Sequence, residues 1–371
     1  MGLTKDSEFV PKWIAWETTR RCNLDCVHCR CSSDAAAPVG AFTTEKALAL
    51  VDDIASFVQP VLVLSGGEPL TRPDIFDIAR HATSKGFRTC MATNGLPVTP
   101  EVCAAMKETG VRMVSLSLDG PNAEVHDGFR RVRGAFDGVV RAAGLLREHG
   151  IQFLVNSSFA RMNQAHIAET FRVAKGLGAR AWYMFMIVPT GRGEDILADL
   201  IRQPDYDDIL AWHYEQERRE DEILMRPTCA PHYYRLVLQK AREDRSGFRR
   251  RDLTFSTGAG KGCVAGQTIC LIDAFGDVRP CSYMEPVAGN VFEQPFRKIW
   301  EDSPLMRSMR DFDSYGGRCG RCEYRNVCGG CRARAYSVAG DVMAEEPFCD
   351  YVPLRMRRER AAAGRPGTGP G

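Results

Sequence analysis

Three cysteines near the start of the chain, Cys22, Cys26 and Cys29, have the spacing C-x3-C-x2-C. Thiolates so close on one loop can hold one face of a four-iron, four-sulfur cluster, which normally takes four ligands. Three cysteines leave one iron without a protein ligand, and an open coordination position is typical of catalytic rather than structural metal sites. A zinc site with Cys31 as its fourth ligand is the alternative interpretation of the same residues.

A glycine-rich turn, residues 66–69 with the sequence Gly-Gly-Glu-Pro, follows the apolar run 61–64. A short continuous apolar run is expected of a strand buried in a parallel sheet. Two adjacent glycines allow the backbone to approach a ligand closely and to adopt angles barred to other residues. An ordinary strand-to-helix turn is the alternative interpretation. The ligand-binding interpretation is favoured because the turn follows the cysteine triplet.

Eight more cysteines lie between residues 255 and 350, namely Cys263, Cys270, Cys281, Cys319, Cys322, Cys328, Cys331 and Cys349. Eight thiolates equal two complete Cys₄ sets, so two further iron–sulfur clusters could be fully ligated. Zinc ribbons stay open as the alternative, because C-x2-C pairs also suit zinc. The remaining cysteines are expected to be small buried apolar residues, and they are Cys31, Cys90, Cys103 and Cys229. We interpret the non-periodic segment 228–235, which contains Cys229, as a substrate-facing loop.

The composition narrows the class of protein. Lys plus Arg number 49 and Asp plus Glu 47, for a net charge of +2, so no global basic field indicates nucleic acid as a partner. The sequence shows neither a signal-peptide pattern nor an apolar run long enough to cross a membrane, and we therefore expect a cytoplasmic protein without a membrane span. Thiols stay reduced in the cytoplasm, so the 15 cysteines indicate metal ligation rather than disulfides.

Apolar and amphipathic segments alternate from residue 13 to residue 187. We expect strands at 13–18, 61–64, 88–92, 112–118, 151–157 and 181–187, and helices at 43–57, 73–85, 99–108, 135–149 and 163–177. Such alternation predicts parallel βαβ units, and the reactive groups of α/β barrels collect at the C-terminal ends of the strands. The charged segment 201–245 is expected to be helical, and the tail, 353–371, to be disordered.

The triplet, with His28 just before its third cysteine, and the Gly-Gly-Glu-Pro turn together resemble the radical S-adenosylmethionine (SAM) enzymes. The resemblance implies a partial (β/α)6 barrel and a [4Fe–4S] cluster whose open iron is chelated by the amino and carboxylate groups of SAM. One electron from the cluster then releases a 5′-deoxyadenosyl radical. By the same resemblance, the ammonium group of SAM would be bound by Gly66, Gly67 and Glu68, and its ribose and carboxylate by Ser117 and Asp119. Asn156 is a further candidate for SAM, with an ordinary turn role as the alternative.

The cysteines after residue 255 resemble the SPASM extension of that family, C-x9-15-G-x4-C, then C-x2-C-x5-C-x3-C and a last cysteine. The chain departs from this form once, with two residues rather than three before Cys331. The resemblance implies one or two auxiliary [4Fe–4S] clusters, one held by Cys263, Cys270, Cys281 and Cys331 and the other by Cys319, Cys322, Cys328 and Cys349. Cys270 stands outside the core form. The expected domains are a barrel at 10–200, a helical bridge at 201–254 and the SPASM domain at 255–352.

Segments 16–22, 188–193, 229–235 and 319–336 resemble the tetrapyrrole-modifying branch of the family, and within it the enzymes of the siroheme-dependent alternative haem pathway. The resemblance implies an iron-tetrapyrrole substrate and the oxidative decarboxylation of two propionates of iron-coproporphyrin III to vinyl groups, which gives haem b. Removal of two acetate side chains from 12,18-didecarboxysiroheme is the alternative. A flavodoxin- or ferredoxin-type protein would supply the electrons.

A tetra-anionic porphyrin needs cationic anchors, and arginine binds carboxylates through two parallel hydrogen bonds. The candidate anchors are Arg130, Arg192 and Arg235, with Arg131 and Arg133 beside the first, and His232 is a candidate ligand of the haem iron. Two other functions stay open. A SPASM enzyme that modifies peptides is disfavoured by the short segment before the first strand, and an iron–sulfur or zinc scaffold is disfavoured by the Gly-Gly-Glu-Pro turn.

Overall fold

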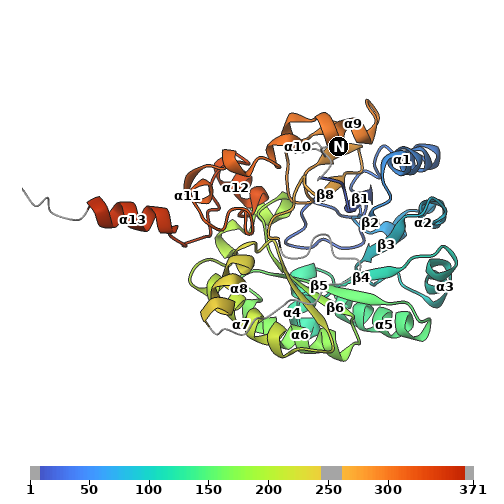
Figure 1. Ribbon diagram of the computed structural model, residues 1–371. Coiled ribbons are helices and arrows are strands. Elements are labelled where there is room, and N and C mark those ends of the chain that lie inside the picture. Colours follow the sequence, from blue (N-terminus) through green and yellow to red (C-terminus); the bar gives the residue numbers. More distant parts are fainter. Residues whose placement is uncertain (1–8, 244–260, 364–371) are drawn as a thin grey trace, which may run out of the picture.

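The computed structural model describes residues 9–243 and 261–363. Ten strands form one sheet with the order β10-β9-β8-β1-β2-β3-β4-β5-β6-β7. The strands from β8 through β1 to β7 pair in parallel, while β9 and β10 pair antiparallel at one edge. The sheet curves into an open barrel that is covered by helices on its outer side (Figure 1). The predicted α/β class and partial parallel barrel are confirmed.

Strands and helices alternate along the barrel. The strands are β1 (Trp13–Thr19), β2 (Val61–Gly66), β3 (Arg88–Thr93), β4 (Met113–Ser117), β5 (Phe153–Phe159), β6 (Ala181–Met186) and β7 (Leu224–Thr228). The helices between them are α1 (Thr44–Phe57), α2 (Ile75–Ser84), α3 (Pro100–Glu108), α4 (Ala123–Arg130), α5 (Ala135–Glu148), α6 (Ile167–Gly176) and α7 (Asp205–Arg219). After β7 come α8 (His232–Glu243), β8 (Ile269–Ile272), β9 (Asp277–Arg279), β10 (Gly289–Asn290), α9 (Phe296–Asp302), α10 (Pro304–Ser308), α11 (Gly317–Gly320), α12 (Arg332–Ala339) and α13 (Leu354–Ala363).

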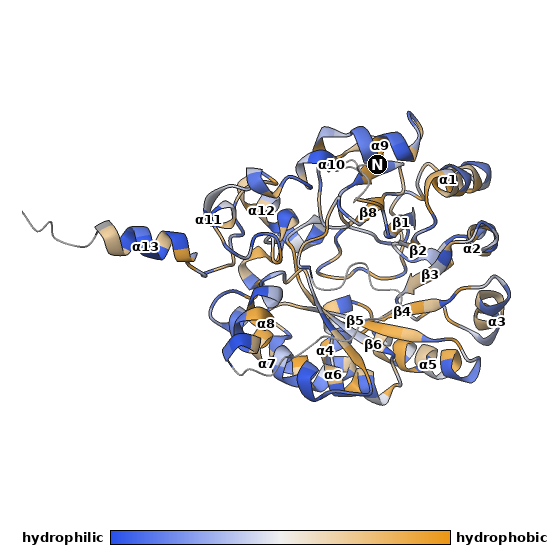
Figure 2. Ribbon diagram, in the orientation of Figure 1, coloured by the Kyte–Doolittle hydropathy of each residue, from blue (hydrophilic) through white to orange (hydrophobic). Residues whose placement is uncertain are grey.

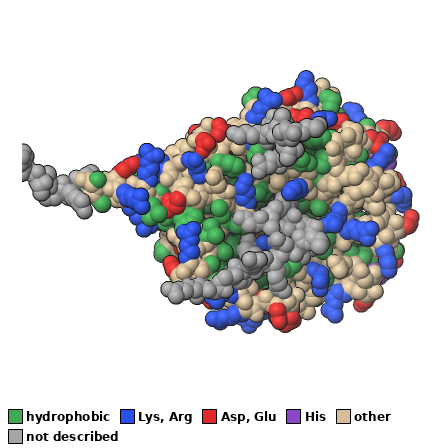
Figure 3. Space-filling model, viewed as in Figure 1, with side chains coloured by type: hydrophobic (Ala, Val, Ile, Leu, Met, Phe, Trp, Pro, Cys, Tyr) green, Lys and Arg blue, Asp and Glu red, His purple; other side chains and the backbone are tan. Residues whose placement is uncertain are grey.

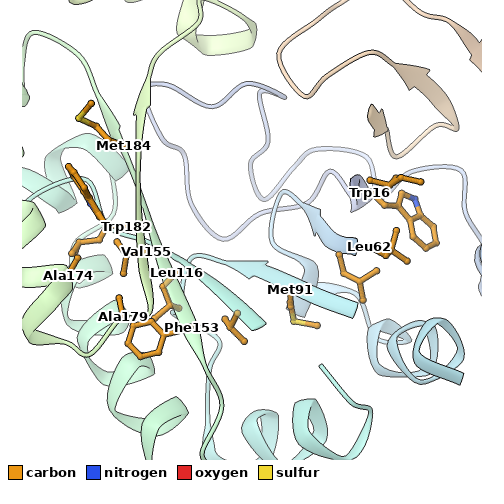
Figure 4. Packing of buried hydrophobic residues seen from close by; sticks show 14 of the residues in the cluster. Trp16, Leu62, Met91, Leu116, Phe153, Val155, Ala174, Ala179, Trp182 and Met184 are labelled. Carbon is orange, nitrogen blue, oxygen red and sulfur yellow. The ribbon is translucent and has the colours of Figure 1, made fainter. Parts of the chain in front are cut away.

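The core lies between the sheet and the helices, because successive side chains of a strand point to opposite faces. Trp16, Leu62 and Trp182 point outward from the strands into this layer, where Figure 4 shows them among other buried apolar side chains. Figure 2 shows the same arrangement as apolar strands beneath helices whose outer sides are polar. The inner face of the sheet carries a separate, smaller apolar cluster that includes Val63 and Met113. Apolar side chains thus cover both faces of the sheet.

Two strands that the sequence analysis did not predict extend the barrel at its ends. The expected helical bridge contains β7, which pairs with β6 in parallel. Its sequence Leu-Met-Arg-Pro-Thr conceals a strand because Pro227 cannot donate to a ladder, and proline is tolerated only on an edge strand such as this one. At the other end, β8 pairs in parallel with β1, so the SPASM segment continues the barrel sheet. The prediction of a purely helical bridge is therefore wrong.

The C-terminal segment also differs from its prediction. Residues Leu354–Ala363 form helix α13 rather than a disordered tail, and the residues beyond 363 lie outside the described part. Helix α13 projects from the body of the protein and carries basic side chains (Figures 1 and 3). None of the described helices combines the length and the apolar character needed to span a bilayer.

Candidate active site

The loop between β1 and α1 places the three N-terminal cysteines at the C-terminal end of β1. The loop has no regular secondary structure, and some of its backbone groups form hydrogen bonds within the loop. For example, Cys22 N–H donates to the Asp34 carbonyl at 2.9 Å. Cys26 is buried, Cys22 and Cys29 are half-buried, and all three belong to one small apolar cluster. The structure therefore brings the three predicted ligands of the SAM-binding cluster together.

Arg130 reaches this loop from the end of α4. Its Nη1 donates to Cys26 Sγ at 3.5 Å, and its Nε lies 2.6 Å from Asp119 Oδ2. Asp119 is fully buried and also accepts a hydrogen bond from Ser158 N–H at 2.7 Å. Burial raises the pKa of Cys26, and the guanidinium of Arg130 opposes that shift. A cation beside Cys26 favours the thiolate, the form that binds metal, so Arg130 serves the cysteine loop and is not free to anchor a propionate.

Arg192 holds the same loop from the turn after β6. Its Nε donates to the Cys26 carbonyl at 2.8 Å and its Nη2 donates to the Ser33 carbonyl at 2.7 Å. Its backbone N–H bonds to the Cys29 carbonyl at 3.0 Å, and its guanidinium lies 3.1 Å from Asp25. These contacts add hydrogen bonds to the backbone carbonyls of a loop that has no regular ladder of its own. The prediction that Arg192 anchors the substrate is therefore at odds with its position in the structure.

Arg30 links the cysteine loop to both β1 and the SPASM segment. Its guanidinium pairs with Glu17 of β1, which is almost fully buried. It also donates to the carbonyl of Ser282 at 3.4 Å. Ser282 directly follows Cys281, so a single side chain connects the region of the N-terminal cysteines to that of the auxiliary cysteines.

The Gly-Gly-Glu-Pro turn packs directly against the start of the cysteine loop. A Cβ on Gly66 would lie 2.2 Å from the Thr19 carbonyl oxygen, and a Cβ on Gly67 would lie 2.2 Å from that of Arg21. Gly66 also has φ +140°. Only glycine permits this approach without displacing the backbone, so the two glycines are required by the turn whatever ligand it binds.

Glu68 braces the turn with its side chain rather than pointing it into open space. Its Oε2 accepts a hydrogen bond from Asn94 N–H at 2.8 Å, and its Oε1 accepts one from Leu70 N–H at 3.2 Å. Burial raises the pKa of Glu68 to about 7. Asn94 in turn donates through Nδ2 to Asn23 Oδ1 at 2.6 Å, beside Cys22. Asn94, which was not among the predicted site residues, thus connects the turn to the cysteine loop.

Ser117 ends β4, and Asn156 lies beside it as its partner in the strand register. Asn156 is in the middle of β5 rather than at its end, because the strand continues to Phe159. Asn156 is also the register partner of Tyr183 on β6. Within the described residues, the buried Oδ1 of Asn156 has no hydrogen-bond partner. A buried polar atom without a partner is costly, so this oxygen fits a donor group of a bound ligand. Together with the cysteines and the glycine turn, these residues suit a [4Fe–4S] cluster with SAM.

The spacing of the cysteines differs from that around a single zinc ion, although the sulfur atoms of Cys29 and Cys31 lie 3.9 Å apart. Sulfurs around one tetrahedral zinc at about 2.3 Å lie about 3.8 Å apart. Among residues 9–243 and 261–363, however, no three cysteines bring their sulfur atoms within 4.8 Å of one another. The one group of three potential metal ligands that close, in this described part, is Glu220, Asp221 and Glu222. A cubane places each thiolate on a different iron and so separates the sulfurs more widely.

The C-terminal cysteines gather in two groups. The four cysteines expected to share one auxiliary cluster line a single small pocket, and they are Cys319, Cys322, Cys328 and Cys349. Cys263, Cys281 and Cys331 meet in a different cluster of side chains. Cys270 lies apart from both groups, because it is fully buried on β8 within the main hydrophobic core. Its assignment as a cluster ligand is at odds with this position.

The two remaining anchor candidates lie near the second auxiliary pocket. His232 lines that pocket and is 1% exposed, and burial lowers its pKa to about 4, so its imidazole is neutral. Arg235 also lines the pocket, but its Nη1 donates to Gln239 at 2.7 Å and its guanidinium stacks on the Tyr351 ring. Both residues belong to α8, and their roles toward a substrate stay predictions.

Comparison with known proteins agrees with this geometry. Residues 16–174 match the family model of the radical SAM superfamily, and residues 263–332 match that of the SPASM iron–sulfur cluster-binding domain. An AdoMet-dependent heme synthase of Methanosarcina barkeri is 45% identical over 92% of this chain and 97% of its own length. One of Nitratidesulfovibrio vulgaris is 42% identical over 93% and 94%. The chain belongs to the radical SAM superfamily and carries a SPASM domain.

Solved structures share the fold at low identity. SuiB of Streptococcus suis with its precursor peptide has a TM-score of 0.72 at 16% identity, covering 94% of this chain and 78% of its own. The structure titled native anSMEcpe with bound AdoMet has a TM-score of 0.65 at 17% identity, covering 94% and 95%. The radical SAM domain binds a [4Fe–4S] cluster and SAM, and the SPASM domain carries auxiliary iron–sulfur clusters.

Gly66→Ala tests the turn. The added Cβ would clash with the Thr19 carbonyl, and the alanine backbone would have to adopt φ +140°, which is strained for any residue except glycine. The turn must therefore move away from the cysteine loop. We expect SAM to bind at least about tenfold more weakly, measured by anaerobic equilibrium binding to the reconstituted protein. Gly144→Ala, in α5 with open space around it, is the matched control. Unchanged SAM affinity in Gly66→Ala would contradict the assigned role of the turn.

Arg192→Ala tests the support of the cysteine loop. The change removes hydrogen bonds to two loop carbonyls, each a loss of about 1–3 kcal/mol, so we expect less iron at the N-terminal site and slower reductive SAM cleavage. Arg80→Ala, which removes an exposed arginine paired with Asp77, is the control. If Arg192→Ala kept full iron and SAM cleavage while losing substrate affinity, Arg192 would be an anchor after all.

Metal analysis tests the cluster assignment. Three four-iron clusters require about 12 irons and as many sulfides per chain, and we expect this content after anaerobic purification and reconstitution. Zinc at stoichiometric levels without sulfide would refute the assignment.

Proposed function

We propose that this protein is an AdoMet-dependent haem synthase, which converts two propionates of iron-coproporphyrin III into vinyl groups and so forms haem b. The observation that carries the proposal is 45% identity, over 92% of the chain and 97% of the relative, to an AdoMet-dependent heme synthase. The M. barkeri protein named Fe-coproporphyrin III synthase is 31% identical, well below that value. Removal of acetate side chains is therefore the second candidate reaction.

The chain's own residues position the reaction partners. The thiols of Cys22, Cys26 and Cys29 would hold the cluster, and the turn at Gly66 and Gly67 would bind the ammonium group of SAM. When bound and reduced, the cluster supplies the electron that cleaves SAM and starts hydrogen abstraction. Ser117 and Asn156, which are partners in the strand register, would orient the nucleoside.

Oxidation of each propionate requires an electron acceptor. Loss of a hydrogen atom from the β-carbon, followed by departure of CO₂, leaves one electron to be removed before the vinyl group is complete. A cluster held by the auxiliary cysteines would supply an acceptor for this electron. Arg30, which contacts the carbonyl of Ser282 next to Cys281, connects that region to the N-terminal cysteine loop.

A reducing partner and a location follow as parts of the proposal. The SAM-binding cluster needs a low-potential electron for each turnover, which a flavodoxin- or ferredoxin-type protein would donate. The described part of the chain has 15 cysteines without disulfides, which suits the reducing cytoplasm.

The reaction is tested by anaerobic incubation of the reconstituted protein with SAM, a reductant and iron-coproporphyrin III or didecarboxysiroheme in separate assays. We expect iron-coproporphyrin III to lose two CO₂ and four hydrogens, read as product mass, with 5′-deoxyadenosine formed in parallel. The variant lacking Cys22, Cys26 and Cys29 is the control for background reduction. Turnover of didecarboxysiroheme with an unchanged iron-coproporphyrin III would establish the second candidate reaction instead.

A further inference from the structure

The incomplete auxiliary set, Cys263, Cys281 and Cys331, has a fourth cysteine beside it. Cys229, Cys263 and Cys281 all pack against the small buried cluster that contains Cys331. Cys229 therefore lies beside the three cysteines of this set. It comes from the barrel, because it directly follows β7, whereas its three neighbours belong to the SPASM segment.

A buried ion pair fixes the backbone of two of these cysteines. Arg334 and Glu346 are fully buried and lie 3.2 Å apart. Arg334 Nη2 donates to the Cys229 carbonyl at 2.9 Å, and Glu346 Oε2 accepts from Cys331 N–H at 2.6 Å. A buried ion pair is more stable where further hydrogen bonds satisfy its atoms, and the backbones of Cys229 and Cys331 supply one such bond each. The pair therefore holds these two residues side by side.

The backbone of Cys229 has a strained conformation, and this conformation sets the direction of its side chain. Cys229 has φ +56°, a left-handed conformation uncommon for a residue other than glycine. Tyr206 also donates to its carbonyl at 3.2 Å, so the conformation is held from two sides. A strained backbone conformation of this kind persists only where surrounding contacts hold it in place. Such residues are found most often at functional sites.

Cys270 offers the opposite picture. It lies within β8 opposite Ile14 of β1, it is fully buried, and its side chain belongs to the main core between the sheet and the helices. Cys270 belongs to neither of the two groups of C-terminal cysteines, and packing in the core explains it.

We propose that Cys229 is the fourth ligand of the first auxiliary [4Fe–4S] cluster, with Cys263, Cys281 and Cys331, and that Cys270 is a core residue. The cluster is thereby tied to the barrel at the end of β7 as well as to the SPASM segment, which fixes its position relative to the SAM site. The inference rests on the family assignment and not on which tetrapyrrole is the substrate.

The experiment isolates the auxiliary clusters by replacing Cys22, Cys26 and Cys29 with alanine, which should leave about eight irons per chain. In this background we compare Cys229→Ala, Cys229→Gly and Cys270→Ala by iron and sulfide content and by electron paramagnetic resonance (EPR) of the reduced protein. Cys229→Gly accepts the left-handed backbone without strain, so it removes the thiol and keeps the fold. The EPR signal of the second auxiliary cluster and the far-ultraviolet circular dichroism report that fold.

We expect both Cys229 variants to lose iron, or to lose or shift one of the two auxiliary signals, while Cys270→Ala keeps about eight irons and both signals. Eight irons and two unchanged signals in Cys229→Gly would overturn the proposal. Loss of an auxiliary signal in Cys270→Ala would overturn it as well. Neither reading requires substrate, so failure of this inference is distinct from failure of the proposed reaction.

Discussion

The site depends on holding an irregular, cysteine-bearing loop in place by buried arginine contacts. The loop after β1 has no regular hydrogen-bond ladder. Arg192 binds two of its backbone carbonyls, and Arg130 faces the sulfur of Cys26. Buried guanidinium groups are stable only with partners of opposite charge and full hydrogen bonding. Asp119 and Glu17 supply those charges to Arg130 and Arg30. The barrel thus fixes the cysteines from three directions before any cofactor binds.

Strand β1 is the shared element of the two cysteine-bearing regions. It pairs with β2 on one side and with β8 on the other, so the glycine turn, the cysteine loop and the start of the SPASM segment leave the same part of one sheet. Arg30 then joins the loop to Ser282 across that boundary. The pairing of β1 with β2 and β8 fixes the two regions relative to one another, since neither can shift without breaking strand pairing.

Much of the barrel was predictable because its strands are short apolar runs separated by amphipathic helices. The missed strand β7 contains Arg226 and Pro227, which remove the apolar signal and the donor that define a strand in sequence. The predicted site residues that come from motifs, such as Cys26 and Gly66, lie together at the strand ends. Their supports were not predictable, because Arg30 and Asn94 act through contacts with residues far away in the chain.

Charge alone misled the choice of substrate anchors. Arginine suits propionates, but Arg130 and Arg192 are both used by the protein itself, and a sequence does not show which arginines find internal carboxylates and carbonyls. The prediction that Cys270 is a cluster ligand has a similar weakness, because the spacing of cysteines along the chain does not tell which face of β8 a thiol occupies.

The central claim is that three thiolates leave one iron of the N-terminal cluster open for SAM. It is tested most directly by electron–nuclear double resonance on the reduced protein with SAM labelled at its amino nitrogen and carboxylate oxygen. The account predicts hyperfine coupling from both labels to the cluster, and its loss when the three N-terminal cysteines are replaced. A cluster spectrum unchanged by SAM, with no coupling to either label, would contradict it.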